Sequence, residues 1–200
     1  SLLSGYERGQ ASSNRLVVGR DMRPHSEPLS AALREGVCSA GIDCVDIGLC
    51  DTPMIYFAIN HLGACGGIQV TASHNPIEYN GFKISGAKAR PIGQGTGLDE
   101  IQRLVSSLRR MPPGATVKPA SELDLWEPYR EHVLRFLKLN RPLRVAVDAS
   151  NGMGGKMIPA VFGGLGDLEI IERNFEIGHG FKHEPNPLVE ANLADVKQAA

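Results

Sequence analysis

Short apolar runs that end in polar turns alternate with helical patterns along the first part of the chain, and this alternation limits the possible folds. The runs are RLVVGRD (15–21), CVDIGLC (44–50) and GGIQVTAS (66–73), which are typical of buried strands. Residues 26–41 and 52–64, between the runs, have the apolar spacing of amphipathic helices. This order predicts an α/β layer structure with a largely parallel sheet.

Both predicted helices carry signals for their ends. We expect Ser26 to be the N-cap of the first helix and Gly41 to end it. In the second helix Thr52 is the expected N-cap, with Pro53 at the first helical position, where its missing N–H is tolerated. A third amphipathic pattern follows at residues 97–110.

Residues 111–121 (MPPGATVKPAS) are rich in proline and small residues, which is typical of a domain boundary. We therefore expect a first domain at 1–112, a linker at 113–125 and a second domain at 126–200. The second alternating series has strands predicted at 144–150 and 168–175 and helices predicted at 124–139, 156–166 and 192–200. Because two parallel strands bury too little surface to stand well alone, we expect the chain to be cut within its second domain.

The charge balance is nearly neutral, which argues against a general attraction to polyanions. With 21 basic and 22 acidic residues the formal net charge is −1, so we expect no nucleic-acid partner and no membrane partner. The sequence has no apolar stretch long enough for a membrane span, and its start lacks a basic-then-apolar signal pattern. The four cysteines (Cys38, Cys44, Cys50 and Cys65) form no CxxC pair and no zinc framework. Reduced cysteines of a cytoplasmic protein are the expectation.

The strand run at 66–73 stops at Ser73-His74-Asn75-Pro76, which places polar groups at the end of a buried strand. Pro76 cannot donate to a sheet ladder and biases the preceding residue away from helix, so the strand has to end here. In α/β sheets, ligands usually bind beyond the carboxyl ends of the strands. Ser73 is therefore a candidate nucleophile, phosphate carrier or metal ligand. The alternative is that Ser73 and Asn75 only cap a turn.

Two further polar side chains accompany the serine. His74 is adjacent to Ser73, and because neighbouring side chains diverge we do not expect a Ser–His general-base pair. His74 either donates a hydrogen bond to an anion or is structural. Lys83 alternates with Phe82 and Ile84 in GFKIS. It points either to solvent on an edge strand or into a polar cleft, where it could serve as a general acid or base.

Asp21 and Arg23 follow the first strand run, in VVGRDMRPHS. If the strands at 15–21 and 66–73 are neighbours, Arg23 shares a sheet edge with Ser73. Its fixed guanidinium then suits the binding of phosphate. The alternative is an ordinary surface arginine.

Three weaker patterns do not support a site. GQGTG (93–97) lacks a strand-to-helix context and is interpreted as a loop. NGMGGKM (151–157) lacks the glycine spacing of a phosphate loop and is interpreted as a tight strand-to-helix turn. His179, His183 and Glu184 lie close together in sequence, without a recognisable metal-ligand spacing.

Four segments, in the same order, resemble the α-D-phosphohexomutases, the phosphoglucomutase and phosphomannomutase superfamily. TASHNPIEYNGFKI (71–84) is similar to the family's active-site serine loop, and GRDMR (19–23) to a segment near its N-terminus. DASNGMGG (148–155) and EPNPLVEANL (184–193) are similar to motifs of its second domain. The resemblance extends over most of the chain. It implies two three-layer α/β/α domains with mixed, mostly parallel sheets, the second incomplete.

The resemblance also implies a chemistry. The family's serine is carried as a phosphoserine on a bound Mg²⁺, and its phosphoryl group moves between C1 and C6 of a hexose phosphate through a hexose 1,6-bisphosphate, which is also the activator. By this likeness Ser73 is the phosphoryl carrier and one Mg²⁺ ligand, and Lys83 acts in proton transfer at the sugar hydroxyl. His74 matches a loop histidine near the phosphate, and Arg23 an arginine on the neighbouring loop. Cationic groups suit phosphoryl transfer, which depends on positioning and electrostatic stabilisation.

The sequence departs from the family pattern at several points. The family's D-x-D-x-D metal loop does not occur, His25 stands where serine is usual, and residues 191–193 are ANL where ENL is usual. We therefore expect a fragment with little mutase activity alone. The alternatives are a non-catalytic sugar-phosphate-binding relative and a phosphatase with a phosphoserine intermediate. Glucose, mannose and glucosamine phosphates all stay open as substrates, as does the oligomeric state.

Overall fold

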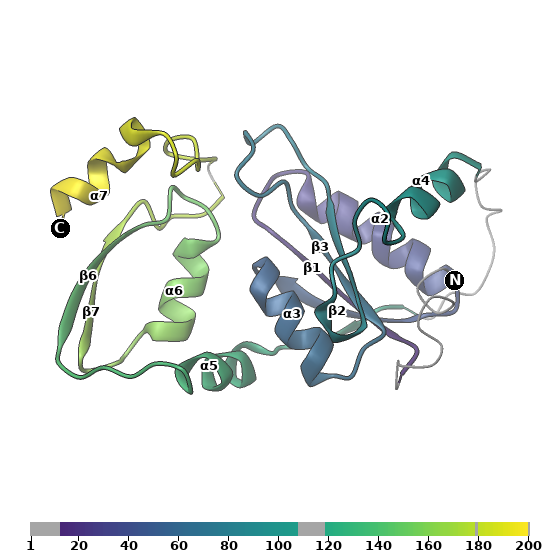
Figure 1. Ribbon diagram of the computed structural model, residues 1–200, viewed down its shortest axis with the longest axis horizontal. Helices are drawn as coiled ribbons and strands as arrows, with labels where there is room; N and C mark the ends of the chain where they lie inside the picture. The colour runs from purple at the N-terminus through teal and green to yellow at the C-terminus, as the bar shows by residue number, and fades with distance from the viewer. Residues whose placement is uncertain (1–12, 108–118, 179, 200) are drawn as a thin grey trace.

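The computed structural model describes residues 13–107, 119–178 and 180–199, and it contains two α/β units that lie side by side (Figure 1). The first unit has a five-stranded sheet with the order β4-β3-β1-β2-β5. Its strands are β1 (Arg15–Arg20), β2 (Asp43–Leu49), β3 (Gly66–Val70), β4 (Phe82–Gly86) and β5 (Ser121–Glu122). Every neighbouring pair is parallel except β3 and β4, so the sheet is mixed and mostly parallel, as predicted.

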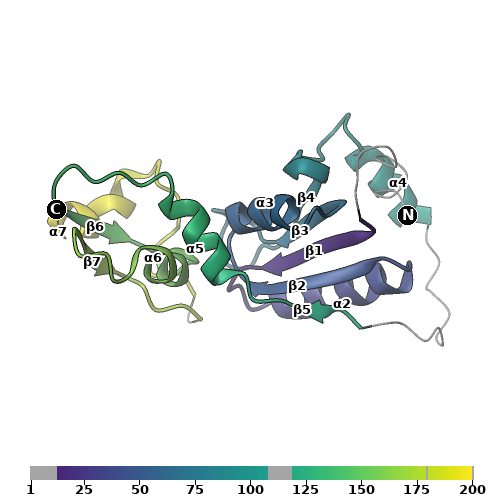
Figure 2. The same cartoon turned by 90° about the horizontal axis from the view of Figure 1, so that it is seen from below.

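Helices cover both faces of this sheet (Figure 2). α2 (Ser26–Ser39) packs on one face and α3 (Thr52–His61) on the other. Leu16 of β1 packs against Leu33 of α2, whereas the next residue, Val17, belongs to the core shared with α3. Adjacent residues of a strand point to opposite faces, so this division follows from the strand geometry. The first unit therefore has three layers.

Both N-cap predictions are wrong by one residue. Ser26 is the first residue of α2, and its hydroxyl donates to the Asp21 carboxylate rather than accepting from the first turn of the helix. At α3 the cap is Asp51, whose carboxylate accepts the Met54 N–H at 3.0 Å. Thr52 is consequently the first helical residue, and the proline that follows it is the second. At α2 the N-cap residue is His25, and no side chain accepts a hydrogen bond from the first turn.

The predicted helix at 97–110 is present as α4 (Leu98–Ser107), with 108–110 outside the described residues. The predicted linker at 113–125 also lies partly outside them. Its later part contains β5, which pairs in parallel with β2. The chain therefore adds a fifth strand to the first sheet before it crosses to the second unit.

The second unit is built on two parallel strands, β6 (Leu143–Asp148) and β7 (Leu168–Arg173), as predicted. Its helices are α5 (Trp126–Leu134), α6 (Gly154–Phe162) and α7 (Ala194–Ala199), and two short 3₁₀ turns occupy Ala87–Ala89 (η1) in the first unit and Glu190–Leu193 (η2) in the second. Tyr129 of α5 and Met157 of α6 belong to the same buried cluster as Met54 of α3. The two units therefore share one continuous apolar core.

The four cysteines are free thiols, as predicted, and Cys44, Cys50 and Cys65 are buried. Burial raises the pKa of the Cys44 thiol to about 12. Because the thiolate is the reactive form, this cysteine is inert near neutral pH.

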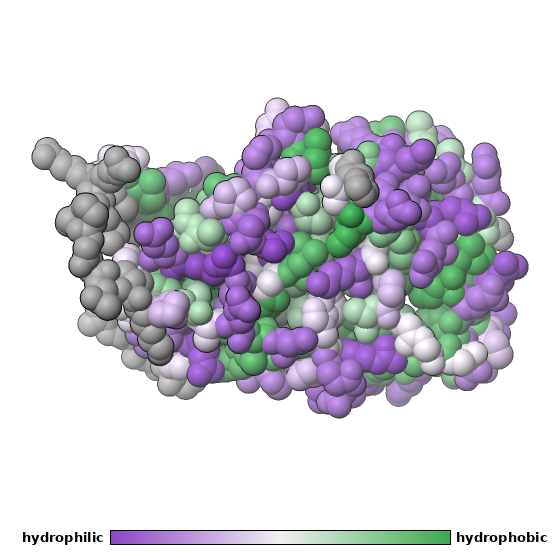
Figure 3. Space-filling model, turned by 180° about the vertical axis from the view of Figure 1, so that it is seen from behind, coloured by the Kyte–Doolittle hydropathy of each residue, from purple (hydrophilic) through white to green (hydrophobic). Residues whose placement is uncertain are grey.

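Polar residues cover much of the face shown in Figure 3, with apolar residues in short stretches between them. Among the described residues, the two most exposed large apolar side chains are Phe136 at 76% and Leu188 at 93%. Among the described residues, no helix has both the length and the apolar character needed to cross a membrane.

The strand order places two loops at one crevice. α2 carries the chain from β1 to its neighbour β2 on one side, whereas the loop after β3 leads to β4 on the other side. The connections that follow β1 and β3 therefore leave the sheet in opposite directions. Open α/β sheets bind their ligands at such a switch point, outside the carboxyl ends of the strands. The residues that follow Arg20 and Val70 meet there.

Replacing Gly19 with alanine is expected to lower the free energy of unfolding by about 1–3 kcal/mol through overpacking. A Cβ at this position would lie 2.5 Å from Cys50 Sγ and 2.9 Å from Ile55 Cδ1. Gly36→Ala in α2 is the control, because nothing lies within 4 Å of its Cβ. Alanine in a helix interior is expected to raise stability by about 0.5–1 kcal/mol. Urea unfolding measures both, and a shift of the same sign in both variants contradicts the packing argument.

Candidate active site

The loop after β3, residues 71–81 (the serine loop), carries Ser73 at the edge of the sheet. A hydrogen bond of 2.9 Å from the Thr71 N–H to the Gly81 carbonyl closes it. Ser73 is exposed and adopts a left-handed backbone conformation with φ of 57°, and its N–H donates to the Thr71 hydroxyl at 3.0 Å. A non-glycine residue in this region is strained and persists only when its surroundings hold it.

Arg23 supplies much of that support. Its side chain is fully buried, and all five guanidinium N–H groups donate to protein acceptors. Nε donates to Asp21 Oδ2 at 3.1 Å, and the two terminal nitrogens donate to four carbonyl oxygens of the serine loop. These carbonyls belong to Ser73 (2.8 Å), Asn75 (2.8 Å), Pro76 (2.5 Å) and Tyr79 (3.0 Å). The sequence suggested that Arg23 binds phosphate, whereas these contacts point to a positioning role.

The Asp21 carboxylate connects three segments of the first unit. It is 6% exposed, and it accepts hydrogen bonds from the Arg23 backbone N–H (3.1 Å), the Ser26 hydroxyl (2.5 Å) and the Thr71 hydroxyl (2.7 Å). Asn80 Nδ2 donates to Ser26 Oγ at 2.9 Å, so the end of the serine loop joins the same network. A buried carboxylate is tolerated only with such partners. The role of Thr71, whose hydroxyl joins Asp21 to the Ser73 N–H, was not predicted from the sequence.

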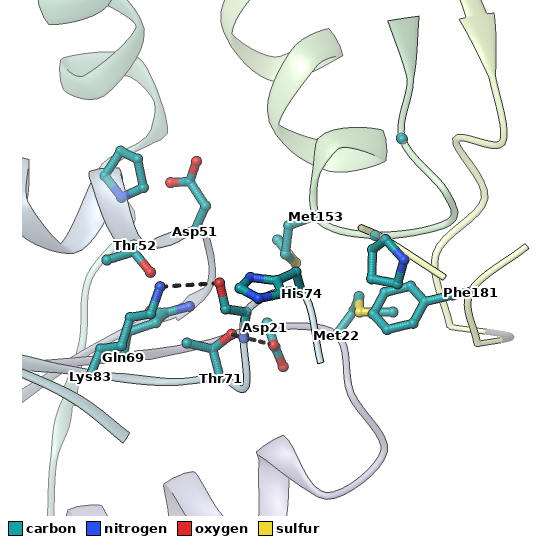
Figure 4. A pocket seen from close by; sticks show the side chains of 15 residues that line it. Asp21, Met22, Asp51, Thr52, Gln69, Thr71, His74, Lys83, Met153 and Phe181 are labelled. Atoms are coloured by element: carbon teal, nitrogen blue, oxygen red, sulfur yellow. Dashed lines mark hydrogen bonds between the residues drawn. The ribbon is translucent and has the colours of Figure 1, made fainter. Parts of the chain in front are cut away.

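Lys83 faces Ser73 from β4. This edge strand pairs antiparallel with β3, with Lys83 opposite Gln69. Lys83 Nζ donates to Ser73 Oγ at 3.5 Å while the side chain stays exposed (Figure 4). The two options that the sequence left open, an edge strand and a polar cleft, therefore both apply. His74 is exposed as well, and in Figure 4 its ring lies toward Met153 of the second unit.

A cleft of about 400 Å³ opens beside Ser73, between the two units. The first unit lines it with Asp21, Met22, Asp51, Thr52, Pro53, Gln69, Thr71, Ser73, His74 and Lys83, and the second with Ala149, Gly152, Met153, Phe181 and Pro185. The first unit therefore supplies the polar wall and the second a mostly apolar one. A cleft of this size accommodates a small organic ligand.

Asp51 adds to this cleft an ionisable group that was not among the predicted site residues. Burial raises the pKa of its carboxyl, and the Met54 N–H that it accepts partly offsets the shift. A carboxyl with a raised pKa at the wall of a cleft is a candidate for proton exchange. The sequence signal was available, because an aspartate directly before a Thr-Pro pair is also a strong N-cap residue.

The described residues do not by themselves complete a site for Mg²⁺, which requires near-octahedral oxygen ligands. Ser73 Oγ faces the cleft, but the Asp21 carboxylate is already bound by protein donors and Asp51 caps α3. In the described ranges no group of three His, Cys, Asp or Glu side chains is placed to hold a metal ion. The oxygen ligands within reach of Ser73 are therefore too few for this ion.

A second polar cluster, the Asp148 clasp, lies at the carboxyl end of β6. Asp148 accepts the Ser150 N–H at 2.8 Å and Asn174 Nδ2 at 3.0 Å through Oδ1, and its Oδ2 lies 3.0 Å from His183 Nε2. Ser150 is 5% exposed, and its hydroxyl donates to the His183 carbonyl at 2.6 Å. This hydroxyl also lies 3.3 Å from His183 Nδ1, but it is buried and its proton is already donated to a carbonyl, so we interpret the cluster as holding a loop. His183 pairs with Asp148, while His179 lies outside the described residues.

The Asp148 clasp is expected to stabilise the fold most between the ordinary pKa values of its two ionisable groups, 3.8 and 6.5. Burial acts to raise the pKa of Asp148, but hydrogen bonds from Asn174 and His183 lower it overall. Burial acts to lower the pKa of His183, but the hydrogen bond to Asp148 raises it overall. The carboxylate's contribution is therefore lost as the pH falls through its lowered pKa. The imidazolium's contribution is lost as the pH rises through its raised pKa.

The measurement is urea unfolding of the wild type and His183→Gln across a pH series. The stability difference between them should be largest inside that window and shrink on the alkaline side. A difference that does not change with pH contradicts an ionised pair.

The chain matches the family model described as phosphoglucomutase/phosphomannomutase, alpha/beta/alpha domain I, over residues 3–110. It is 38% identical over 193 residues to a phosphomannomutase of Escherichia coli (strain K12). It is 35% identical over 187 residues to a phosphoglucomutase of Neisseria gonorrhoeae. These alignments cover 92% and 91% of this chain, but only 42% and 39% of the relatives. The chain thus spans less than half the length of the curated relatives that it matches.

Two solved structures resemble both units. A phosphoglucomutase/phosphomannomutase family protein from Burkholderia thailandensis has a TM-score of 0.77 at 32% identity, covering 99% of this chain and 43% of that one. A putative phosphomannomutase from Thermus thermophilus has a TM-score of 0.76 at 29% identity, covering 99% of this chain and 46% of that one. The family model matches more than half of this chain, and the curated relatives and solved structures carry the same family names. The chain therefore belongs to the phosphoglucomutase/phosphomannomutase family.

Proposed function

We propose that this chain is the serine-bearing portion of a hexose phosphate mutase. Such an enzyme moves a phosphoryl group between C1 and C6 of a sugar phosphate, through a phosphoserine and a bisphosphorylated sugar. The observation that carries the proposal is the exposed Ser73 Oγ, which lies at a cleft, 3.5 Å from Lys83 Nζ. The relatives named phosphomannomutase and phosphoglucomutase support a hexose phosphate as the substrate.

The residues at the cleft suit a reversible transfer. When the group leaves phosphorylated Ser73, the bond between phosphorus and Oγ breaks and a bond to the sugar oxygen forms. The sugar hydroxyl loses a proton and Ser73 Oγ gains one. Lys83 is within reach of Oγ to move that proton, and we propose that His74, which lines the cleft, donates a hydrogen bond to the phosphoryl group. Arg23 contributes by fixing the backbone of Ser73.

The same transfer in reverse explains the role of an activator. A hexose 1,6-bisphosphate presents a phosphate at either end, and donating one of them to Ser73 restores the phosphoserine. Mg²⁺ would supply neutralisation of charge at the transferring group. We propose that phosphorylated Ser73 gives it one oxygen ligand and that its other ligands lie outside these 200 residues. This division accords with a chain that spans 42% of its relatives.

The test is the fate of phosphate at Ser73. A protein that contains this chain and the metal ligands is incubated with Mg²⁺ and a hexose 1,6-bisphosphate, and mass spectrometry maps phosphate on peptides that cover 71–84. We expect phosphate on Ser73 and hexose monophosphate in solution, and neither in Ser73→Ala. Release of inorganic phosphate in step with bisphosphate consumption would favour a phosphatase. An unmodified Ser73 would favour a non-catalytic sugar-phosphate-binding relative.

A further inference from the structure

An aromatic ring of the second unit covers the arginine that holds the serine loop of the first. The centroid of the Phe181 ring lies 5.1 Å from Cζ of the Arg23 guanidinium. The five N–H groups of this guanidinium point outward in its plane and are all bonded, so only its two faces remain for other contacts. An aromatic face attracts a cation electrostatically, and more strongly when water is excluded. Arg23 is 2% exposed, so this contact is desolvated.

Phe181 is itself firmly attached to the second unit. The N–H of the next residue, Lys182, donates to the Ser150 carbonyl at 3.4 Å, and the Ser150 hydroxyl donates to the His183 carbonyl at 2.6 Å. His183 in turn pairs with Asp148. The ring also packs near the turn after β6, since a Cβ on Gly152 would lie 3.6 Å from Phe181 Cε1. The position of the ring is therefore set by the Asp148 clasp.

We propose that Phe181 is a positioning residue, which acts through Arg23 to keep the serine loop closed. Without the ring, water reaches the face of the guanidinium and hydrates the charged group. The hydrogen bonds from Arg23 to the loop carbonyls then weaken, and Ser73 leaves its strained conformation more often. The effect on loop opening does not require any reaction, whereas its effect on phosphoryl transfer rests on the proposed function. In Figure 4, Phe181 lies beside Met22 on the side of the cleft formed by the second unit.

Hydrogen–deuterium exchange of the chain tests the loop directly. The Asn75 and Tyr79 amides are protected by hydrogen bonds of 3.1 Å within the loop, and the Ser73 amide by its bond to Thr71. Phe181→Leu keeps an apolar side chain but removes the ring. We expect these amides to exchange about five- to thirty-fold faster in this variant, because losing a desolvated cation–π contact favours loop opening by about that factor. Phe181→Tyr keeps the ring and should restore wild-type exchange.

The matched control is Phe162→Leu in α6, a phenylalanine that is partly buried in the shared core and is not in contact with Arg23 as a ring partner. It loses the same atoms from the second unit, so it should leave serine-loop exchange unchanged. Equal acceleration in Phe162→Leu and Phe181→Leu would assign the effect to general loosening and overturn the proposal. Unchanged exchange in Phe181→Leu would overturn it as well. If Phe181→Leu does not fold, Phe181→Met against Phe181→Tyr makes the same comparison.

A second readout separates this inference from the proposed function. In a protein that also contains the metal ligands, the rate at which hexose 1,6-bisphosphate charges Ser73 should fall in Phe181→Leu and recover in Phe181→Tyr. Faster loop exchange in Phe181→Leu, together with no charging of Ser73 in the wild type, would refute the mutase function and leave the positioning role intact. Normal charging of Ser73 in the wild type, together with unchanged loop exchange in Phe181→Leu, would support the mutase function and refute the positioning role.

Discussion

Replacing Arg23 with methionine is expected to lower the free energy of unfolding by about 3–5 kcal/mol, the range for removing one partner of a buried ion pair. Methionine has a similar reach but no charge and no donor. Four loop carbonyls would each lose one donor, of which only that of Pro76 keeps another among the described residues, the Tyr79 N–H, and the Asp21 carboxylate would stay buried with one fewer partner. An unsatisfied buried group carries its full desolvation penalty. Chemical denaturation followed by circular dichroism measures the loss.

Two further variants separate charge from shape at this position. Arg23→Lys keeps a positive charge, but its ammonium group has three donors where the structure uses five, so it should recover only part of the stability. Arg103→Met removes an arginine whose side chain is 73% exposed and should change stability little. If Arg23→Met unfolds at the same denaturant concentration as Arg103→Met, the loop network contributes nothing.

Replacing Lys83 with methionine is expected to slow phosphoryl transfer between Ser73 and the sugar by roughly 10²–10⁴-fold, the usual contribution of a proton-transfer group. The fold should survive, because Lys83 is exposed on an edge strand and bonds only to Ser73 Oγ among the contacts described for its side chain. Serine charging should also be slowed, since the same proton moves in the reverse step. The measurement is a single-turnover experiment that follows loss of phosphate from Ser73 to a hexose monophosphate.

Lys88→Met provides the control for a lost surface charge. Lys88 is exposed in η1, just beyond the other end of β4, so it lies away from Ser73. Its replacement should leave the transfer rate unchanged. A rate for Lys83→Met close to that of Lys88→Met would mean that another group moves the proton, and Asp51 would be the first to examine because of its raised pKa.

The position of the site could be predicted from the sequence, because the residues that end a strand stand next to it in the chain. Pro76 cannot continue a strand, and the pattern of Ser73-His74-Asn75-Pro76 therefore marks the end of β3. Alternation of strands and helices then brings the end of β1 beside it. The β5 strand could not be predicted in this way. Ser121 and Glu122 carry no strand pattern and are paired only because the chain returns along β2.

The partners of the site residues could not be predicted, because they depend on distant segments. Whether Arg23 meets a phosphate or carbonyls depends on how the serine loop folds around it, 50 or more residues away in sequence. The pairing of Asp148 with His183 spans 35 residues and a loop. Phe181 lies in a segment with no regular pattern, and its contact with Arg23 depends on how the two units meet. Spacing along a chain contains no information about such contacts.

The hairpin formed by β3 and β4 has a consequence for turnover. Ser73 and Lys83 belong to the two sides of this one hairpin, whereas the opposite wall of the cleft belongs to the second unit. A hinge motion that separates the units would widen the entrance while Ser73 and Lys83 stay on the first unit, and it would also withdraw the Phe181 ring from Arg23. Under the proposed function, a bisphosphate would gain room to turn end over end when the units separate, and the serine loop would be held again when they close. Access to the cleft and closure of the serine loop would thus be coupled through the contact between Phe181 and Arg23.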